Sequence, residues 1–203
     1  GGMRLVDLVD AATGRHLLAD KTLPLFAATL RNVDTDEAVE VAADGGWTRC
    51  EASRDGQGPV ELRWAGPADK RLDGLRVVAR ATPDAAANAL GWNLLVEGVP
   101  AGWTLWDVTF PQLPLARLGP DAKVLFPRGC GEVQEDPWER SFRYGGTYPS
   151  GWTSMQFMAA YSGEDGREDR TGLYVAAHDP AAATKDLLLE SRPADGAVVF
   201  SLT

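Results

Sequence analysis

Residues 154–161 read SMQFMAAY and residues 172–177 read GLYVAA, and these two stretches decide the fold class. Successive side chains of an extended chain point to opposite sides, so every second residue shares a face. In the first stretch, one face consists of four apolar residues: Met155, Phe157, Ala159 and Tyr161. We predict two strands joined by a polar hairpin, with this face turned towards the core.

Segments of the same kind recur along the chain between turns rich in Gly, Pro and Asp. Residues 75–80 alternate clearly, with Arg76 and Arg80 on one face and apolar side chains on the other. Further strands are predicted at residues 4–9, 15–18, 25–30, 37–41, 60–64, 92–97, 103–110, 187–189 and 197–200. Short strands at this spacing are typical of an antiparallel β-sandwich with minor helical turns, not of βαβ units. We predict one all-β domain over residues 1–203.

Two hairpins are expected from the turn residues. Residues 4–9 and 15–18 flank a turn that contains Gly14, which can adopt positive φ. Residues 92–97 and 103–110 are expected to pair across the segment between them.

Other segments are expected to interrupt the strands. Residues 83–90 are rich in Ala and predict either one or two helical turns or a hairpin loop. Asp179 followed by Pro180 is typical of the start of a helix, so a short helix is predicted there. Regular pairing is expected to end at three prolines, which cannot donate to a strand ladder: Pro111, Pro114 and Pro120.

The charge balance excludes some partners. The chain has 20 basic and 29 acidic residues, a net charge of −9 and a pI near 4.7. A nucleic-acid binder needs a basic face against phosphates, so no nucleic-acid partner is expected. No apolar run is long enough to span a bilayer, so no membrane partner is expected either.

The cysteines and the short motifs indicate no cofactor. Cys50 and Cys130 are the only cysteines, and they could form one disulfide or remain two buried free thiols. They lack metal-ligand spacing, so no metal site is expected. The glycine-rich nucleotide motifs and the Gly-x-Ser-x-Gly motif are also missing.

Residues 126–152 form a loop region rich in aromatic, acidic and basic side chains. Such a loop on a rigid sheet is a common way to build a site for polar ligands. Trp138 and Trp152 could serve as a sugar platform, a domain interface or local packing, whereas Trp92 and Trp106 are expected in the core. Four carboxylates could contain an acid–base pair for glycoside hydrolysis or simply be solvated: Glu132, Glu135, Asp136 and Glu139.

Two histidines are present, His16 and His178. His16 lies beside a turn with no matched partner for catalysis. His178 could bond nearby backbone while Asp179 caps a helical turn, or both side chains could face a ligand.

Several short motifs resemble one family. Residues 4–10 with Thr13-Gly14-Arg15 resemble the opening hairpin of galactose-mutarotase-like β-sandwich domains that precede glycoside hydrolase barrels. Residues 106–111, followed by residues 125–127 and Gly129, resemble a later passage of the same domains. The remaining matches resemble a bacterial domain-of-unknown-function family within that group: Tyr148-Pro149, Met155-Gln156-Phe157, Tyr161, Gly172-Leu173-Tyr174, His178-Asp179-Pro180 and Lys185.

The resemblance implies a β-supersandwich that packs on a catalytic (β/α)₈ barrel, with the catalytic carboxylates on the barrel. The chain would then be a non-catalytic N-terminal domain, a fragment of a longer glycoside hydrolase, that supports the barrel and contributes to carbohydrate binding. The alternatives are a stand-alone aldose 1-epimerase and a purely structural interaction module. The residues expected at the rim of the sugar site are Glu132, Trp138, Arg140, Tyr148, Trp152 and His178.

Overall fold

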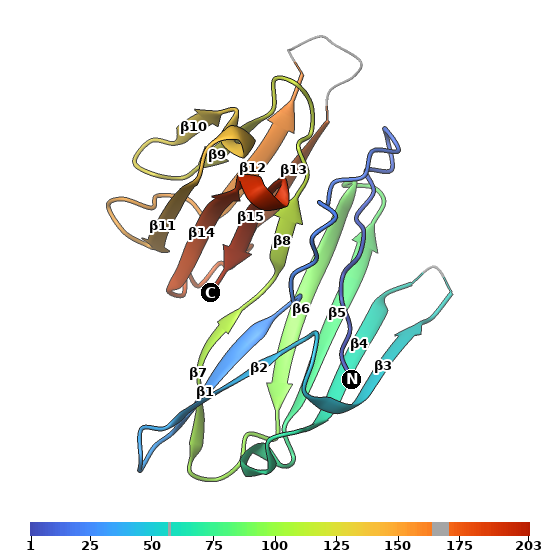
Figure 1. Ribbon diagram of the computed structural model, residues 1–203, viewed down its shortest axis with the longest axis vertical. Coiled ribbons are helices and arrows are strands. Elements are labelled where there is room, and N and C mark those ends of the chain that lie inside the picture. The colour runs from blue at the N-terminus through green and yellow to red at the C-terminus, as the bar shows by residue number, and fades with distance from the viewer. Residues whose placement is uncertain (57, 164–170) are drawn as a thin grey trace. The chain divides into compact units, whose positions relative to one another are not determined.

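A computed structural model of the protein describes residues 1–56, 58–163 and 171–203. Within these ranges the chain is almost entirely β-structure, and all its paired strands are antiparallel (Figure 1). Three single 3₁₀ turns are the helical structure in the described part of the chain. The predicted all-β antiparallel sandwich with minor helical turns is therefore confirmed.

The strands and turns have the following bounds. The strands are β1 (Ala27–Asn32), β2 (Ala38–Ala42), β3 (Trp47–Arg54), β4 (Val60–Pro67), β5 (Arg76–Asp84), β6 (Ala89–Glu97), β7 (Trp103–Thr109), β8 (Gln112–Leu115), β9 (Lys123–Phe126), β10 (Glu132–Glu135), β11 (Phe142–Tyr148), β12 (Phe157–Ser162), β13 (Thr171–Ala176), β14 (Lys185–Arg192) and β15 (Ala197–Leu202). The 3₁₀ turns are η1 (Lys70–Leu72), η2 (Pro137–Glu139) and η3 (Pro193–Asp195).

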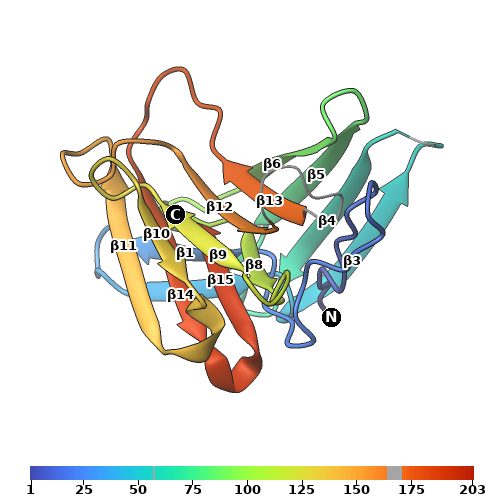
Figure 2. The same ribbon diagram turned by 90° about the horizontal axis from the view of Figure 1, so that it is seen from above.

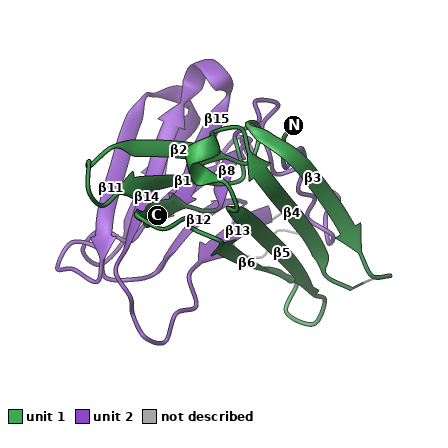
Figure 3. Cartoon of the chain, turned by 90° about the horizontal axis from the view of Figure 1, so that it is seen from below, with its two compact units in different colours: residues 1–4, 24–110 green, residues 5–23, 111–203 purple. Residues whose placement is uncertain are grey.

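Contacts divide the chain into two compact units. Unit 1 contains residues 1–4 and 24–110, and unit 2 contains residues 5–23 and 111–203. Figure 2 gives a second view of the strands, and Figure 3 colours the two units. Each unit has two sheets and its own buried side chains. The assignment of residues 1–203 to a single domain stays a prediction.

Unit 1 is built from a sheet with the strand order β2-β1-β7 and a sheet with the order β3-β4-β5-β6. Phe26, just before β1, lies edge-on to Trp64 of β4 at a centroid distance of 5.0 Å and near Trp47 of β3 at 6.4 Å. The indole N–H groups of Trp47 and Trp64 donate to the carbonyls of Ala42 and Ala43 at 2.7 and 2.8 Å. Burial of these rings is therefore not opposed by an unpaired donor.

Unit 2 is built from a sheet with the order β10-β9-β12-β13 and a sheet with the order β11-β14-β15-β8. Their facing sides share one apolar core, to which β9, β12, β14 and β15 all contribute. Fully buried members include Phe126, Met158, Leu189 and Phe200. This core also positions residues 127–152. The prediction of one loop region there was wrong in part, because the segment contains β10, η2 and β11.

The face of β12 that points into this core is not the predicted one. Met158 and Ala160 are fully buried, whereas Phe157, Ala159 and Tyr161 are half-buried on the opposite face. Both faces of β12 carry apolar side chains, so the size of these side chains does not identify the face that packs into the core. The predicted core face was therefore wrong: it is offset by one residue from the face that is buried.

We expect adjacent alanines of β12 to respond very differently to a charge. Ala160→Glu should lower the free energy of unfolding by roughly 3 kcal/mol or more, because a carboxylate would enter the apolar core. Ala159→Glu, on the half-buried face, should cost under about 1 kcal/mol. Urea denaturation of both variants measures the difference, and equal losses would contradict the assigned phase.

The opening hairpin is present without its predicted strands. Asp10 and Arg15 are joined by a backbone hydrogen bond of 2.9 Å, and Val9 and His16 form an isolated bridge. The backbone N–H of Leu17 donates to the carbonyl of Leu8 at 2.8 Å. Residues 4–8 nevertheless lie outside any strand, so the predicted strand at residues 4–9 was wrong.

The second predicted hairpin does not form. β6 pairs with β5 over nine residues, whereas β7 pairs with β1 in the other sheet. Residues 98–102 carry the chain between the sheets, with Gly98 and Gly102 at positive φ. The reason lies in residues 85–88, which form a tight turn between β5 and β6: the Asp84 carboxylate accepts from the N–H groups of Ala86 and Ala87. β5 therefore pairs with the edge of β6 that β7 was predicted to occupy. Residues 83–90 were predicted as either helical turns or a hairpin loop, and the hairpin loop is correct.

Pro114 also departs from expectation, because it lies inside β8 opposite Val199 of β15. β8 ends its sheet, so the missing N–H of proline breaks no ladder between two strands. The Pro114 carbonyl accepts from the N–H of Ala19 at 2.8 Å. Pro111 and Pro120 lie outside the strands as predicted.

Candidate functional site

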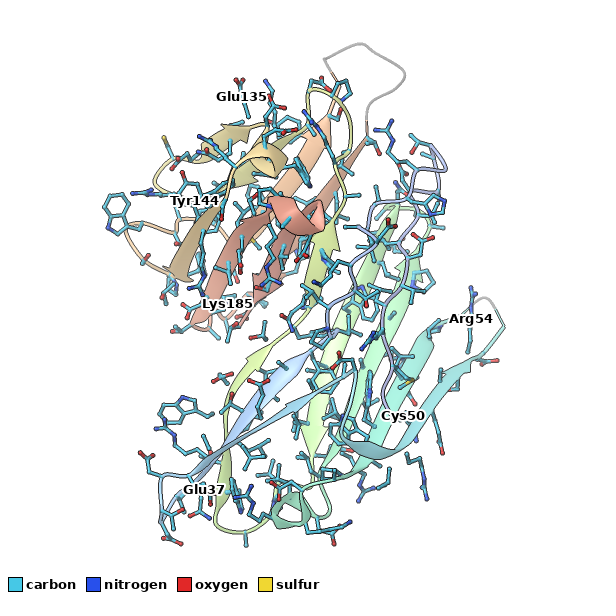
Figure 4. All side chains as sticks on the ribbon, in the orientation of Figure 1. Glu37, Cys50, Arg54, Glu135, Tyr144 and Lys185 are labelled. Carbon is cyan, nitrogen blue, oxygen red and sulfur yellow. The ribbon has the colours of Figure 1, made fainter. Side chains whose placement is uncertain are left out.

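The six predicted site residues occupy four places in unit 2. Glu132, Arg140 and Trp152 belong to one connected group, which Figure 4 locates by its labelled member Tyr144. Tyr148 lies beside Lys185, and His178 lies beside Tyr174. The remaining residue, Trp138, is in the core.

Glu132 links two strands that do not pair. β10 and β11 are the terminal strands of the two sheets as described. Oε1 of Glu132 in β10 accepts from the hydroxyl of Tyr144 in β11 at 3.0 Å and from Nε2 of Gln134 at 2.7 Å. One carboxylate oxygen thus joins the two sheets at this side of the sandwich.

Gln134 extends this network to Arg140. Its side chain is buried, and its Oε1 accepts from Nη2 of Arg140 while its Nε2 donates to Glu132. A buried amide is costly unless it is hydrogen-bonded, and here both its oxygen and its nitrogen have partners. The Arg140 guanidinium also lies 5.7 Å from the ring centre of Phe142. Arg140 is therefore held on two sides although it is exposed.

Tyr144 contributes a protonated hydroxyl to the network. Burial raises its pKa, and the hydrogen bond and charge of Glu132 raise it further. Its ring packs against Phe142 and Phe126 at centroid distances of 5.2 and 6.0 Å. The hydroxyl is consequently fixed as a donor to the carboxylate at neutral pH.

Arg128 connects this network to Trp152. Its guanidinium carbon lies 5.0 Å from the Trp152 ring centre and 5.8 Å from the Tyr144 ring centre. Its Nη1 lies 3.7 Å from Oε2 of Glu132. The Trp152 side chain is 67% exposed. Trp152 therefore offers an accessible indole next to a guanidinium, an arrangement stabilised by cation–π attraction.

The loop that carries Trp152 is fixed by its backbone. The N–H of Trp152 donates to Oγ of Ser150 at 3.3 Å, and its carbonyl accepts from the N–H of Gly129 at 2.7 Å. The hydroxyl of Ser154 donates to the Gly129 carbonyl at 2.6 Å. The platform is thus held on both sides before any ligand arrives, which lowers the entropy cost of binding.

Thr153 anchors the same loop against β11. It is buried, and its side chain occupies the space beside Gly146. A Cβ added at Gly146 would stand 1.9 Å from Oγ1 of Thr153. The absence of a side chain at residue 146 is therefore what allows the loop to seat.

We expect Gly146→Ala to destabilise the protein by about 1–3 kcal/mol, because the methyl group overlaps Thr153. The double variant with Thr153→Ala should recover about 1 kcal/mol or more of that loss. Gly145→Ala is a matched control, since its Cβ would meet only ordinary contacts with Leu188. Urea denaturation measures all of these variants, and a loss at residue 145 equal to that at 146 would contradict the packing.

The other acidic residues of this region form exposed ion pairs. Glu135 pairs with Lys123 at 3.0 Å, while Asp136 and Glu139 both pair with Arg117 at 2.6 Å. These three carboxylates line an open hollow of about 580 Å³ together with Val133, Gln134 and Arg140. All three carboxylates are exposed and paired with cations, which agrees with the solvated alternative.

Trp138 is not available as a platform. It is buried in η2, and its indole N–H donates to the carbonyl of Leu115 at 3.0 Å. Of the three uses considered for it, local packing is the one realised in the structure. Trp152 alone of the pair remains a candidate for stacking.

Tyr148 belongs to a second group that centres on Lys185. The Lys185 side chain is only 13% exposed, and its ammonium lies 5.1 Å from the Tyr148 ring centre. It donates to Oε1 of Gln156 at 2.7 Å, to Oδ2 of Asp179 at 3.1 Å and to the Ala183 carbonyl. The three donors of the ammonium are thereby satisfied.

Asp179 caps a turn, as predicted, but no helix follows. Its carboxylate accepts from the N–H groups of Ala181 and Ala183 at 2.9 and 2.7 Å. Ala182 has a φ of 52°, and this left-handed residue stops helical continuation. His178 is exposed beside Tyr174, with the ring centres 6.2 Å apart. His178 and the Asp179 carboxylate thus take part in different contacts.

We expect Asp179 to make stability depend on acid pH. The Lys185 hydrogen bond, supported by two backbone N–H groups, lowers the pKa of Asp179 in the folded chain. Its contribution is therefore present above pH ~4 and is lost as the pH falls through the lowered folded pKa. Denaturation across this range should show a weaker acid dependence for Asp179→Asn. The exposed Asp20→Asn serves as control, and unchanged acid dependence in Asp179→Asn would contradict the assignment.

Four further residues belong to these groups but were not predicted as members: Arg128, Gln134, Tyr144 and Gln156. One local signal was available, because Glu132 and Gln134 are two residues apart and share a face of a strand. Nothing local indicates that this face meets Tyr144. That contact depends on the fold of the whole unit.

The remaining candidates lie elsewhere. His16 pairs with Asp7 through Nδ1 at 2.7 Å and is exposed. Cys50 and Cys130 are free thiols, one half-buried and one exposed, so they are not two buried thiols. Burial raises the pKa of Cys50.

Residues 1–56, 58–163 and 171–203 contain no group of three or more His, Cys, Asp or Glu side chains arranged to hold a metal ion. Among the same residues, no helix has the length and apolar character needed to cross a bilayer.

A scan against protein-family models, a search of curated proteins and a search of solved structures each gave no match to this chain. The resemblance to galactose-mutarotase-like domains therefore stays a prediction that rests on short motifs. Four of those motif residues do meet in the Lys185 group: Tyr148, Gln156, Asp179 and Lys185.

Proposed function

We propose that this chain is a non-catalytic β-sandwich module of a glycoside-hydrolase-like protein, and that it binds a sugar at Trp152 while it supports a catalytic barrel. The observation that carries the binding role is an exposed indole on an anchored loop, beside a guanidinium. Trp152 is 67% exposed and its neighbours Ser150 and Thr153 fix the loop. An indole held in this way can stack on the apolar C–H face of a sugar ring without first being ordered.

The groups around Trp152 suit the hydroxyls of a sugar. Arg128 supplies N–H donors, and Oε2 of Glu132 supplies an acceptor that is bonded less closely than Oε1. Both side chains are held by their neighbours, so a bound sugar would meet a donor and an acceptor beside a flat apolar surface. This combination favours a neutral polyol over an apolar ligand.

The candidate catalytic side chains that the structure describes take part in separate local contacts. The acidic residues near η2 are paired with cations, and His16 and His178 belong to separate local contacts. An epimerase would need its acid and base at one sugar carbon. We therefore place catalysis on the barrel that the resemblance implies.

A docking role is the second candidate, favoured by the outer face of the sheet β10-β9-β12-β13. The strand registers align Val133, Leu125, Ala159 and Tyr174 in one row across the four strands. Val133 and Tyr174 are 44% and 56% exposed. A contiguous row of this kind is more typical of an interface than of a solvated sheet face.

We expect the full 203-residue chain to bind methyl β-D-galactopyranoside or N-acetylgalactosamine with a Kd of roughly 1 mM, a typical weak affinity of about −4 kcal/mol. Trp152→Ala should weaken binding about tenfold, because the stacking surface is lost. The backbone amide signals of Gly129, Ser150 and Thr153 report binding in an NMR titration. Tyr174→Ala is the matched control, since it removes another exposed aromatic of unit 2.

The same titration separates the two candidates. A module that only docks on a partner would show no saturable shift at these amides up to high millimolar sugar. That outcome would remove the ligand role of Trp152 and leave the docking role.

A further inference from the structure

Trp106 is presented at the surface by an irregularity in β7. The register between β1 and β7 shifts at this point, so that Thr29 faces Asp107 while Leu30 faces Leu105. Trp106 is the extra residue without a partner in β1, which is the definition of a β-bulge. The expectation that Trp106 lies in the core was wrong, because its side chain is 58% exposed.

An arginine covers one face of the Trp106 ring. The guanidinium carbon of Arg31 lies 3.9 Å from the ring centre, a close cation–π contact. Arg31 is itself held by Asp36, with Nη1 and Oδ1 3.2 Å apart, and its side chain is 33% exposed. The indole is consequently fixed from one side and accessible from the other.

The surroundings of Trp106 are short and polar. The register of the sheet β2-β1-β7 aligns Glu40, Thr29 and Asp107 in one row across the three strands. The next row on this face contains Ala38, Arg31 and Thr104. The face therefore surrounds one aromatic ring with hydroxyls and carboxylates.

We propose that Trp106 is a second stacking site of this protein, and that its ligand is the ring of an uncharged sugar. The carboxylates of Glu40, Asp107 and Asp36 can accept hydrogen bonds from sugar hydroxyls, and they repel anions such as uronates or phosphates. The Arg31 charge already lies against the ring, so a second cation gains less on the opposite face. A neutral polyol with an apolar ring face satisfies both conditions.

A protein partner fits this face less well. Stable protein interfaces have a core of several apolar side chains and bury ~800 Å² on each partner. Here Trp106 has Thr29, Thr104 and Ala38 in the rows beside it. One ring with polar neighbours matches a single sugar unit in size.

This site is built from other residues than the one proposed at Trp152. The two tryptophans belong to different units, and each ring has its own arginine, Arg31 and Arg128. The ligand class is the same, but either site can fail without the other. The experiment uses reporters that separate them.

The test is an NMR titration of the full chain with methyl β-D-galactopyranoside and methyl β-D-glucopyranoside, with galacturonate as the anionic comparison. We expect saturable shifts of the backbone amides of Thr29, Arg31 and Thr104 with at least one neutral glycoside, and binding about tenfold weaker for galacturonate. Trp106→Ala should weaken the neutral sugar about tenfold at these amides, whereas Trp106→Phe should retain part of the affinity.

Three controls make the result decisive. Leu95→Ala removes another exposed apolar side chain of unit 1 and should leave the titration unchanged, as should Trp152→Ala. Circular dichroism establishes that Trp106→Ala keeps its β-structure. The proposal is overturned if the three amides show no saturable shift, if Trp106→Ala binds as the parent chain does, or if a lysine-rich peptide shifts them where neutral sugars do not.

Discussion

The carboxylate of Glu132 is the contact on which the candidate site in unit 2 depends. It joins β10 to β11 through Tyr144, satisfies the buried amide of Gln134, and lies beside Arg128. Two terminal strands with no shared ladder would otherwise leave this side of the sandwich open between them. Because Arg128 in turn contacts Trp152, the position of the exposed indole is tied to the way the two sheets close.

The sequence predicts the strands of this protein better than their partners. Alternation located β4 and β5 because one face of each is apolar and the other is more polar, whereas short apolar runs at residues 187–189 and 197–200 located β14 and β15. It failed for β12, where both faces carry apolar residues and the neighbours Val124 and Leu173 select which one is buried. The strands β6 and β7 were located, but their predicted pairing was wrong, since β6 pairs with β5 over nine residues and β7 pairs with β1.

The exposure of one tryptophan could be predicted from the sequence, whereas the exposure of the other could not. Trp152 follows Pro149 and Gly151, so its exposure could be predicted from turn residues alone. Trp106 lies within a regular strand pattern, and only the bulge opposite Thr29 turns it outward. Each has an arginine beside the ring, but Arg31 and Arg128 are distant in sequence from the rings they contact, and spacing therefore gives no hint of either pair.

The fit of Thr153 beside Gly146 has a consequence for how this surface can change over time. Since the two residues share one volume, their substitutions are coupled. A larger residue at position 146 is tolerated only when a smaller residue stands at position 153. Trp152 is the immediate neighbour of Thr153 but is exposed to solvent, so its size is not limited by the space beside Gly146. The loop thus combines a tightly packed anchor, Thr153, with an adjacent exposed residue, Trp152, whose replacement leaves the packing against Gly146 unchanged.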